Sequence, residues 1–228
     1  MKKKSICIIP ARGGSKRIPR KNIKDFHGKP LIAYSIEVAK KSGLFEKIIV
    51  STDDEEIASI SKEYGAEIQI RPKKLSDDFT GTEEVINYVL NTLKKDGLEY
   101  DYICTLYATS PLLQDVYLIK GFQELEISNA KYSFSATSFE APTWWAFKIK
   151  NNRCKTISKE YFNIRSQDLE ETYFDAGQFY WNKIQNKSNN IIFGKDSIPI
   201  ILPRHLVQDI DTLEDWKRAE YMYEILNR

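Results

Sequence analysis

A basic loop with two glycines lies close to the start of the chain. Residues 8–22 read Ile-Ile-Pro-Ala-Arg-Gly-Gly-Ser-Lys-Arg-Ile-Pro-Arg-Lys-Asn, an apolar strand end that runs into five basic side chains. We expect Gly13 and Gly14 to allow positive φ and close approach, so that their N–H groups face anionic oxygens. The basic residues, which supply forked donors and point charges, are Arg12, Lys16, Arg17, Arg20 and Lys21. The loop is therefore predicted to bind a polyphosphate.

The positive charge of the chain is gathered at this end. The first thirty residues hold ten Lys or Arg and one acid, Asp25, whereas the net charge of all 228 residues is +2. A solvated surface turn is the alternative, but a strand, two glycines and interleaved basic residues coincide where α/β sheets bind ligands. The P-loop and G-x-G-x-x-G dinucleotide patterns are absent. We expect a small anion as the partner and no nucleic acid, because the charge beyond the loop is balanced.

A second chemical signal lies near the other end of the chain, in Asp209-Ile210-Asp211. In an extended segment alternate side chains point to one side, so Asp209 and Asp211 would face one ligand together. Mg²⁺ takes one or two protein carboxylates and completes its shell with water and phosphate oxygens. The alternative is that Asp211 caps the following helix while Asp209 is solvated. Combined with a phosphate loop, the pair predicts a Mg²⁺ site.

The elements that must position these residues alternate between strands and helices. Such alternation predicts an α/β fold, with a Rossmann-like, mostly parallel sheet, right-handed crossovers and flanking helices. From about residue 131 the pattern changes to strands separated by turns, which indicates an antiparallel extension over 131–182 within one domain spanning 1–228. The expected strands are 5–10, 47–51, 67–70, 101–107, 132–138, 144–150, 178–182 and 198–202, and the expected helices are about 31–43, 55–64, 83–95 and 212–226.

Composition bears on where the protein works. The sequence has no run of about eighteen apolar residues, so we expect no contact with a membrane. The basic start resembles that of a signal peptide, but residues 6–9 are too short for its apolar region. Cys7, Cys104 and Cys154 are widely spaced, as is typical of reduced thiols, and two histidines disfavour a histidine-rich zinc site. We therefore expect a cytoplasmic protein.

Several further motifs lie along nearly the whole chain. Together with residues 9–22 they are Gly-Lys-Pro-Leu-Ile-Ala-Tyr-Ser-Ile at 28–36, Val-Ser-Thr-Asp-Asp-Glu-Glu-Ile-Ala at 50–58, Arg-Pro at 71–72, Thr-Ser-Pro-Leu at 109–112 and Asp-Ile-Asp-Thr at 209–212. These motifs resemble those of the cytidylyltransferases that activate nine-carbon acidic sugars. The resemblance implies the nucleotide-diphospho-sugar transferase type of α/β fold.

Some segments resemble one branch of this family, the branch that activates pseudaminic acid. In the sialic-acid branch a glutamine and a proline usually stand where this chain has Tyr107 and Ala108, and an Asn-Gly pair stands at Ala176-Gly177. Both departures fall where the family holds its sugar, so the resemblance favours pseudaminic acid over N-acetylneuraminic acid. The segments that resemble the pseudaminate branch are 17–20, 165–171 and 175–181.

The resemblance also implies a reaction and the residues that serve it. The anomeric hydroxyl of the sugar would attack the α-phosphorus of CTP and displace pyrophosphate, mostly through positioning and charge neutralisation. By similarity the catalytic residues are Arg12, Lys21, Asp209 and Asp211, and the two aspartates hold Mg²⁺. The nucleotide would contact Arg12, Gly13, Gly14, Ser15, Lys21, Asn22, Arg71, Thr80 and Thr82. The sugar would contact Tyr107, Arg165, Gln167, Asp175, Gln178 and Tyr180.

Members of this family are usually homodimers whose extension reaches into the partner, a role that the resemblance implies for residues 131–182. An ion pair of Arg165 with Asp168 or Glu171 is an equal alternative to its contact with the sugar.

Legionaminic acid is an alternative substrate, while Lys21-Asn22 argues against a shorter keto-deoxy sugar acid. A catalytically silent nucleotide-binding module is the remaining alternative, since fold does not determine activity.

Overall fold

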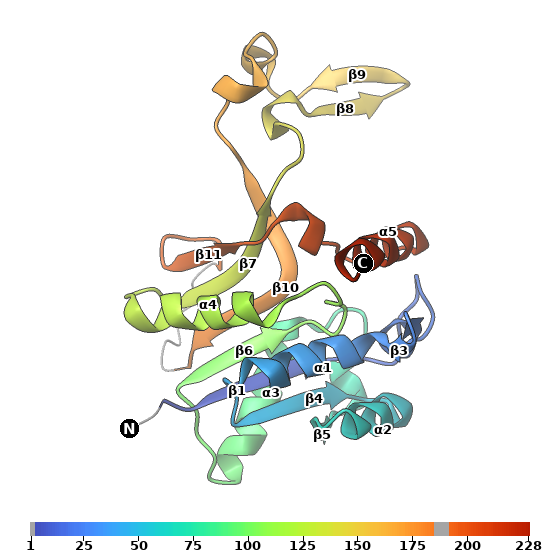
Figure 1. Ribbon diagram of the computed structural model, residues 1–228, viewed down its shortest axis with the longest axis vertical. Coiled ribbons are helices and arrows are strands. Elements are labelled where there is room, and N and C mark those ends of the chain that lie inside the picture. The colour runs from blue at the N-terminus through green and yellow to red at the C-terminus, as the bar shows by residue number, and fades with distance from the viewer. Residues whose placement is uncertain (1–2, 185–191) are drawn as a thin grey trace.

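The computed structural model describes residues 3–184 and 192–228. Within them a seven-stranded sheet forms the centre of the molecule, in the order β11-β7-β10-β6-β1-β4-β5 (Figure 1). β10 is antiparallel to both of its neighbours, and the other pairings in this sheet are parallel. The predicted mostly parallel α/β fold is confirmed. The strands are β1 Ser5–Pro10, β4 Lys47–Thr52, β5 Glu67–Ile70, β6 Tyr102–Leu106, β7 Tyr132–Ser138, β10 Tyr173–Lys183 and β11 Ser197–Ile201.

Helices cover both faces of the sheet. One face shares a hydrophobic cluster with α1, α2 and α4, and the opposite face packs against α3. The last helix, α5, packs instead against the start of α1 and a small hairpin, β2 Asp25–Phe26 with β3 Lys29–Pro30. The helices are α1 Leu31–Ser42, α2 Glu55–Glu63, α3 Thr82–Lys95, α4 Asp115–Ile127 and α5 Leu213–Leu226.

β1 is an unbroken apolar run because both of its sides are covered. Ile6 and Ile8 pack in the cluster with α3, while Cys7 and Ile9 pack in the cluster with α1, as the alternation along a strand requires. All four side chains are fully buried. Parallel strands inside α/β sheets have this character, since helices lie on both faces. The strand ends at Pro10, directly before the basic loop.

The carboxyl ends of the parallel strands β1, β4, β5 and β6 meet at one edge of the sheet. β4 lies on one side of β1 and β6 on the other, so the order of the strands reverses between β1 and β6. Open α/β sheets bind ligands in the crevice at such a reversal. The basic loop follows β1 at this edge, Arg71 follows β5, and Tyr107 follows β6.

An arm formed by residues 139–172 rises from the sheet between β7 and β10 (Figure 1). It carries a hairpin of β8 Phe147–Lys150 and β9 Arg153–Thr156. Asn151 and Asn152, at the turn of this hairpin, both have positive φ, which suits a tight two-residue turn.

The structure differs from the expected extension in two respects. β7 and much of β10 pair within the central sheet, so the projecting part is shorter than 131–182. The strand expected at 144–150 begins at Phe147, because a 3₁₀ turn at Thr143–Trp145 follows Pro142. Periodicity in the sequence cannot distinguish a strand that joins the main sheet from a strand that leaves it.

Aromatic packing fixes the C-terminal helix. The ring centroid of Phe26 lies 5.4 Å from that of Trp216 and 5.5 Å from that of Tyr223, both edge to face. Thr212 and Asp215 form a capping box at the start of α5. Thr212 is therefore the N-cap, and the alternative in which Asp211 caps the helix is wrong.

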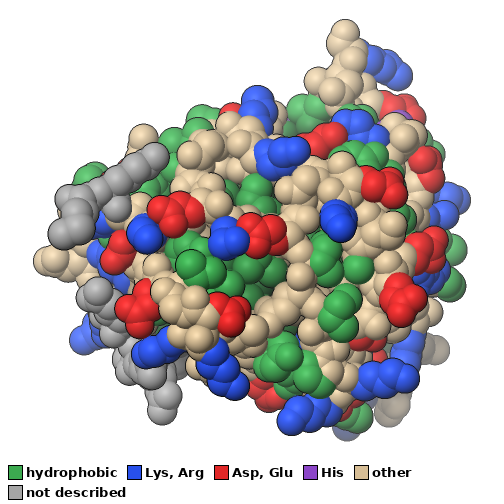
Figure 2. Space-filling view, turned by 90° about the horizontal axis from the view of Figure 1, so that it is seen from below, with side chains coloured by type: hydrophobic (Ala, Val, Ile, Leu, Met, Phe, Trp, Pro, Cys, Tyr) green, Lys and Arg blue, Asp and Glu red, His purple; other side chains and the backbone are tan. Residues whose placement is uncertain are grey.

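The surface turned away from the arm carries mixed charge. Lys and Arg are interspersed there with Asp, Glu and apolar side chains (Figure 2). A basic stripe, which is the electrostatic mark of nucleic-acid binding, does not appear on that face. In the described part of the chain, none of the helices combines the length and the apolar character needed to cross a membrane.

Candidate active site

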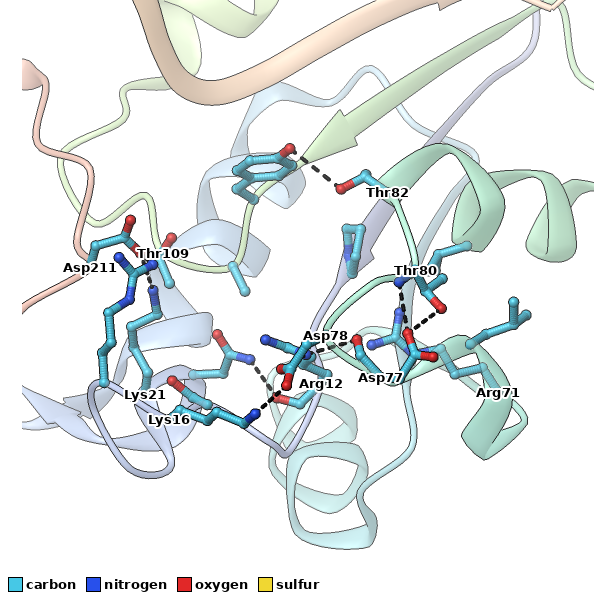
Figure 3. A pocket seen from close by; sticks show the side chains of 18 residues that line it. Arg12, Lys16, Lys21, Arg71, Asp77, Asp78, Thr80, Thr82, Thr109 and Asp211 are labelled. Carbon is cyan, nitrogen blue, oxygen red and sulfur yellow. Dashed lines mark hydrogen bonds and ion pairs between the residues drawn. The ribbon is translucent and has the colours of Figure 1, made fainter.

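A cavity of about 650 Å³ opens at the carboxyl edge of the sheet, beside β1 and β6 (Figure 3). Lys21 and Asp211 lie at one end of it, Arg71 and Thr80 lie at the other, and Arg12 lies between them (Figure 3). Residues far apart in the sequence thus meet around one space. The predicted site residues that line the cavity are Arg12, Ser15, Lys21, Asn22, Arg71, Thr80, Thr82, Tyr107 and Asp211.

The two glycines of the basic loop do not have the conformation that we expected. Neither Gly13 nor Gly14 has positive φ. A Cβ on Gly13 would lie 2.5 Å from Oδ2 of Asp54, and the Gly13 N–H donates to Oδ1 of Asp53 at 3.1 Å. Gly13 is therefore required for close approach to the end of β4, and its N–H is already bonded to a carboxylate. A Cβ on Gly14 would meet nothing within 4 Å.

Arg20 anchors the loop and does not line the cavity. Its guanidinium forms a two-pronged ion pair with Asp54, with one contact at 2.9 Å, and a further ion pair with Glu56. Asp54 also accepts from the N–H of Ile57 as the N-cap of α2. The hydrogen bonds from Arg20 lower the pKa of Asp54 to about 2, although partial burial opposes them. This acid and base pair therefore joins the loop to α2.

Asn22 is a structural part of the loop as well as a lining residue. Its side chain is 8% exposed, and its Nδ2 donates to the carbonyl of Arg12 at 3.0 Å. This bond spans the loop and orders the backbone at Arg12. The predicted contact between Asn22 and a nucleotide stays a prediction.

Lys21 connects the two ends of the chain. Its Nζ donates to the carbonyl of Ile210 and lies 3.3 Å from Oδ1 of Asp211. Arg17 contacts the same carboxylate oxygen at 2.7 Å. The Lys21 side chain is 18% exposed, so its charge acts in a less polar environment than those of its neighbours. The basic loop and the Asp-Ile-Asp segment therefore form one charged cluster.

Asp209 lies next to this cluster but does not line the cavity in the chain alone. Partial burial raises the pKa of its carboxyl, and the negative charge of Asp211 raises it further, while Lys21 and Arg17 act in the opposite direction. The Asp211 charge therefore acts on the Asp209 carboxyl. The pair is a hard-oxygen donor set of the kind that Mg²⁺ prefers.

The opposite end of the cavity combines the guanidinium of Arg71 with hydroxyl groups. Arg71 is 5% exposed, donates from Nε to Ser76 at 3.1 Å, and has its pKa lowered by burial. Thr82 and Tyr107 lie with their hydroxyl oxygens 3.5 Å apart. A buried guanidinium with hydroxyl groups nearby can recognise a polar planar group such as a base.

The residues predicted for the sugar fall into two sets. The first set consists of Tyr107, which lines the cavity, and of Asp175, Gln178 and Tyr180, which do not line it. The Tyr180 ring lies 5.4 Å from the Tyr107 ring, and its hydroxyl donates to Asp175 at 2.5 Å. Burial and this bond to Asp175 raise the pKa of Tyr180. Gln178 is 3% exposed and donates to the Leu206 carbonyl, while its Oε1 is buried without a partner.

Arg165 and Gln167, the second set, lie on the arm and are exposed. Arg165 donates from Nε to Asp168 at 2.7 Å, so the ion pair that we considered as the alternative is present. Neither residue lines the cavity within the single chain. Their predicted contact with a sugar stays a prediction.

Comparison with known proteins decides the family. Residues 6–190 match the family model described as Cytidylyltransferase. The chain belongs to the cytidylyltransferase family. It is 44% identical over 225 residues to a pseudaminic acid cytidylyltransferase of Campylobacter jejuni, with 97% of each chain covered.

Two further comparisons agree with this assignment. The chain is 42% identical over 211 residues to a longer Helicobacter pylori protein named as a pseudaminic acid cytidylyltransferase and UDP-2,4-diacetamido-2,4,6-trideoxy-beta-L-altropyranose hydrolase, with 91% of this chain and 40% of that protein covered. A solved CMP:2-keto-3-deoxy-manno-octonic acid synthetase complexed with CTP superposes with a TM-score of 0.69 at 16% identity, covering 98% of this chain and 99% of that chain. The second likeness concerns the fold, and it supports the expected transferase type.

Sequence reasoning missed two acidic residues of this cytidylyltransferase site, Asp77 and Asp78. Asp77 accepts from the N–H and the hydroxyl of Thr80, both at 2.7 Å. Asp78 lies 2.7 Å from Nη1 of Arg12. A signal was available, because an acidic pair stands between Arg71 and Thr80, which were both predicted to line the site.

Removing a cation that faces the cavity is expected to weaken catalysis severely. We expect Arg12→Ala and Lys21→Ala each to lower kcat/KM by about 10²–10³-fold, because each supplies charge where the phosphates gather negative charge. Pyrophosphate release measures the effect, and Lys217→Ala, on an exposed position of α5, is the control. Losses of similar size in all three variants would contradict a local role.

Proposed function

We propose that the enzyme transfers the cytidylyl group of CTP to the anomeric hydroxyl of pseudaminic acid and releases pyrophosphate. The observation that carries the proposal is the meeting of the basic loop with Asp211 around one cavity. The choice of sugar rests on a similarity that spans 97% of this chain and 97% of a relative named for that substrate. The fold alone would not identify the reaction.

The cavity suggests how CTP binds. In the proposal the triphosphate lies along Arg12, Ser15 and Lys21, and the cytosine lies toward Arg71 and the hydroxyl groups of Thr80 and Thr82, at the other end of the cavity (Figure 3). A pocket built for a pyrimidine rejects purines by size and by unpaired polar groups. The α-phosphate would then sit between the base end and the Asp211 end.

The transfer itself is an in-line displacement. The anomeric oxygen forms a bond to the α-phosphorus, and the bond from that phosphorus to the bridging oxygen of the β-phosphate breaks. The electron pair leaves with pyrophosphate, and the hydroxyl proton passes to water. The chain contributes by holding the two reactants in position and by neutralising phosphate charge with Arg12 and Lys21.

Asp209 and Asp211 are the proposed ligands of Mg²⁺. Their donor set fits this ion, because carboxylate oxygens are the ligands that Mg²⁺ prefers. Burial and, to a lesser extent, the negative charge of Asp211 raise the pKa of the Asp209 carboxyl, and a divalent cation would offset the repulsion between the two groups. No group of three or more His, Cys, Asp or Glu in residues 3–184 and 192–228 is placed to hold a metal. The remaining ligands would be water and phosphate oxygens. Bound Mg²⁺ would polarise the α-phosphate.

The sugar is proposed to bind near Tyr107, where the cavity adjoins Tyr180 and Asp175. Ala108 also lines the cavity, while Ala176 is 1% exposed and packs in the core. Ala108 and Ala176, the small residues that depart from the sialic-acid pattern, would therefore have different roles. Ala108 would shape the pocket, and Ala176 would shape the backbone of β10 behind it.

The arm supports a proposed homodimer. Several of its apolar side chains are exposed in the single chain, with Ile149 72% exposed and Phe147 52% exposed, and further examples at Phe139, Ile157, Phe162 and Ile164. An exposed apolar surface of this kind marks a protein interface. In a dimer with two-fold symmetry the arm would reach the partner, and Arg165 and Gln167 would gain access to the partner's sugar site.

We place the reaction in the cytoplasm. Cys7 and Cys104 are buried free thiols that lie opposite each other on the adjacent strands β1 and β6. Cys154 is an exposed free thiol on the arm. Free thiols of this kind are typical of a reducing compartment. CTP is also available there.

Loss of the metal ligands is the first test of this mechanism. We expect Asp209→Asn and Asp211→Asn each to lower kcat by at least about 100-fold without loss of folding, because charge stabilisation of the transferred group is lost. EDTA should have the same effect on the unmodified enzyme. Glu214→Gln, an exposed acid in the first turn of α5, is the matched control. Full activity of both variants at unchanged Mg²⁺ dependence would exclude the metal assignment.

A panel of sugars tests the substrate. With CTP and Mg²⁺ present, we expect kcat/KM for pseudaminic acid to exceed the values for N-acetylneuraminic and legionaminic acids by at least about 100-fold. The physical reason is that a site whose polar groups are placed for one stereochemistry leaves them unpaired with another. Pyrophosphate release measures the reaction. An equal or higher value for N-acetylneuraminic acid would overturn the choice of sugar and leave cytidylyl transfer intact.

The dimer is tested at the arm. We expect Ile149→Asp to shift the protein to monomers in sedimentation analysis and to reduce activity, because a buried charge would oppose the apolar interface. Lys148→Asp, on the neighbouring position of the same strand, is the control for added negative charge. A protein that is monomeric and fully active before any substitution would contradict the proposal.

A further inference from the structure

The side of Arg12 that faces the cavity is occupied by a carboxylate of the chain itself. Nη1 of Arg12 donates to Oδ1 of Asp78 at 2.7 Å and to the Asp77 carbonyl at 2.8 Å. Lys16 forms an ion pair with the other oxygen of Asp78. In Figure 3 Asp78 lies in the middle of the cavity, between the Asp211 end and the Arg71 end. One carboxylate therefore pairs with two cations of the basic loop and offsets one of their two charges.

The arrangement around Asp78 is the one that a phosphate would adopt. Two oxygens of one anion bridge a guanidinium and an ammonium group, which is a common way to hold a phosphate. The bonds from Lys16 and Arg12 also lower the pKa of Asp78 below its usual range and so favour its charged form. Asp78 is an anion already in place at the site proposed for the triphosphate.

These ion pairs are suited to exchange. The side chains of Arg12, Lys16 and Asp78 are 35%, 76% and 36% exposed. Exposed pairs contribute little net stability, because water and salt compete for the same charges. A triphosphate carries several charges and can contact more of the loop than one carboxylate can. Displacement of Asp78 by such a ligand is therefore favourable.

The segment that carries Asp78 is a self-contained turn. Oδ1 of Asp77 accepts from the N–H of Phe79 at 3.0 Å and from the N–H and hydroxyl of Thr80. Phe79, at the tip, is 94% exposed and so is not held by core packing. Gly81 leads into α3 and has open space where a Cβ would lie. An exposed side chain on such a turn can leave its partners without disturbing the core.

We propose that Asp78 is a built-in counter-anion of the phosphate loop, which the nucleotide's polyphosphate must displace and which thereby sets nucleotide affinity. The inference rests on the proposed function in taking that polyphosphate to be the one of CTP. Without ligand, Asp78 offsets part of the charge of Arg12 and Lys16 and so reduces the attraction of the loop for smaller anions. With ligand, the triphosphate pairs with both cations and the side chain of Asp78 turns away from them.

Calorimetric titration with inorganic tripolyphosphate tests the proposal. We expect Asp78→Asn to bind tripolyphosphate about 3–10-fold more tightly than the unmodified protein, because no internal ion pair has to be broken first. The KM for CTP should also be lower in Asp78→Asn than in the unmodified enzyme. Glu99→Gln, which removes a charge at an exposed position between α3 and β6, should change the affinity less than twofold.

Unchanged or weaker binding by Asp78→Asn would overturn the proposal, and weaker binding would indicate that Asp78 contacts the ligand or its metal. Asp78→Ser provides a second test if the first variant is poorly folded. Failure of the proposed function has a separate signature. If the unmodified enzyme released no pyrophosphate from CTP with any sugar of the panel, the reaction would be wrong, while the tripolyphosphate comparison would still report on Asp78.

Discussion

The site depends on the contact of Asp211 with Lys21 and Arg17. These residues are about 190 positions apart in the chain, and their ion pairs at 3.3 and 2.7 Å join the loop after β1 to the segment before α5. Neither segment belongs to the central sheet. Their relative position is therefore set elsewhere, by the packing of α5 through Trp216 on Phe26 and by the capping box that begins the helix. The C-terminal helix is thus part of the scaffold of a site that the N-terminal loop dominates.

The basic loop is held in shape by bonds that use its own polar groups. Gly13 donates to Asp53, Arg20 pairs with Asp54, and Asn22 bonds the carbonyl of Arg12. Two of these partners lie at the end of β4, next to β1 in the sheet, so the sheet itself positions the loop. Cations in such a loop repel one another, and the surrounding acids offset that repulsion. Preorganisation of this kind lets the remaining donors face a ligand without a further loss of entropy.

Much of this arrangement could be predicted from local signals. β1 has the predicted bounds, because the short apolar run predicts a buried strand and Pro10 marks its end. Gly43 adopts positive φ at the end of α1, as a C-cap glycine should. The presence of Arg12, Lys21 and Asp211 around one cavity follows from combining two separate motifs. In each case the residue type itself limits the local structure.

The failures share a cause in long-range geometry. Arg17 and Arg20 are chemically equivalent in the sequence, yet one faces Asp211 and the other faces α2, which depends on where α2 begins. Asp78 reaches Arg12 across 66 positions; its place between Arg71 and Thr80 in the sequence puts it near the site but does not indicate which cation it contacts. The environment of Gln178 also depends on distant segments, because its side-chain amide donates to the carbonyl of Leu206 and its predicted contact with the sugar stays a prediction.

A crystal structure of the enzyme with CTP and Mg²⁺ would show whether one cavity holds the triphosphate between the basic loop and Asp211. We expect triphosphate oxygens within hydrogen-bonding distance of Arg12 and Lys21, with the metal on the Asp211 carboxylate. A nucleotide bound elsewhere, with Asp211 still paired to Arg17 and remote from any metal, would contradict this expectation.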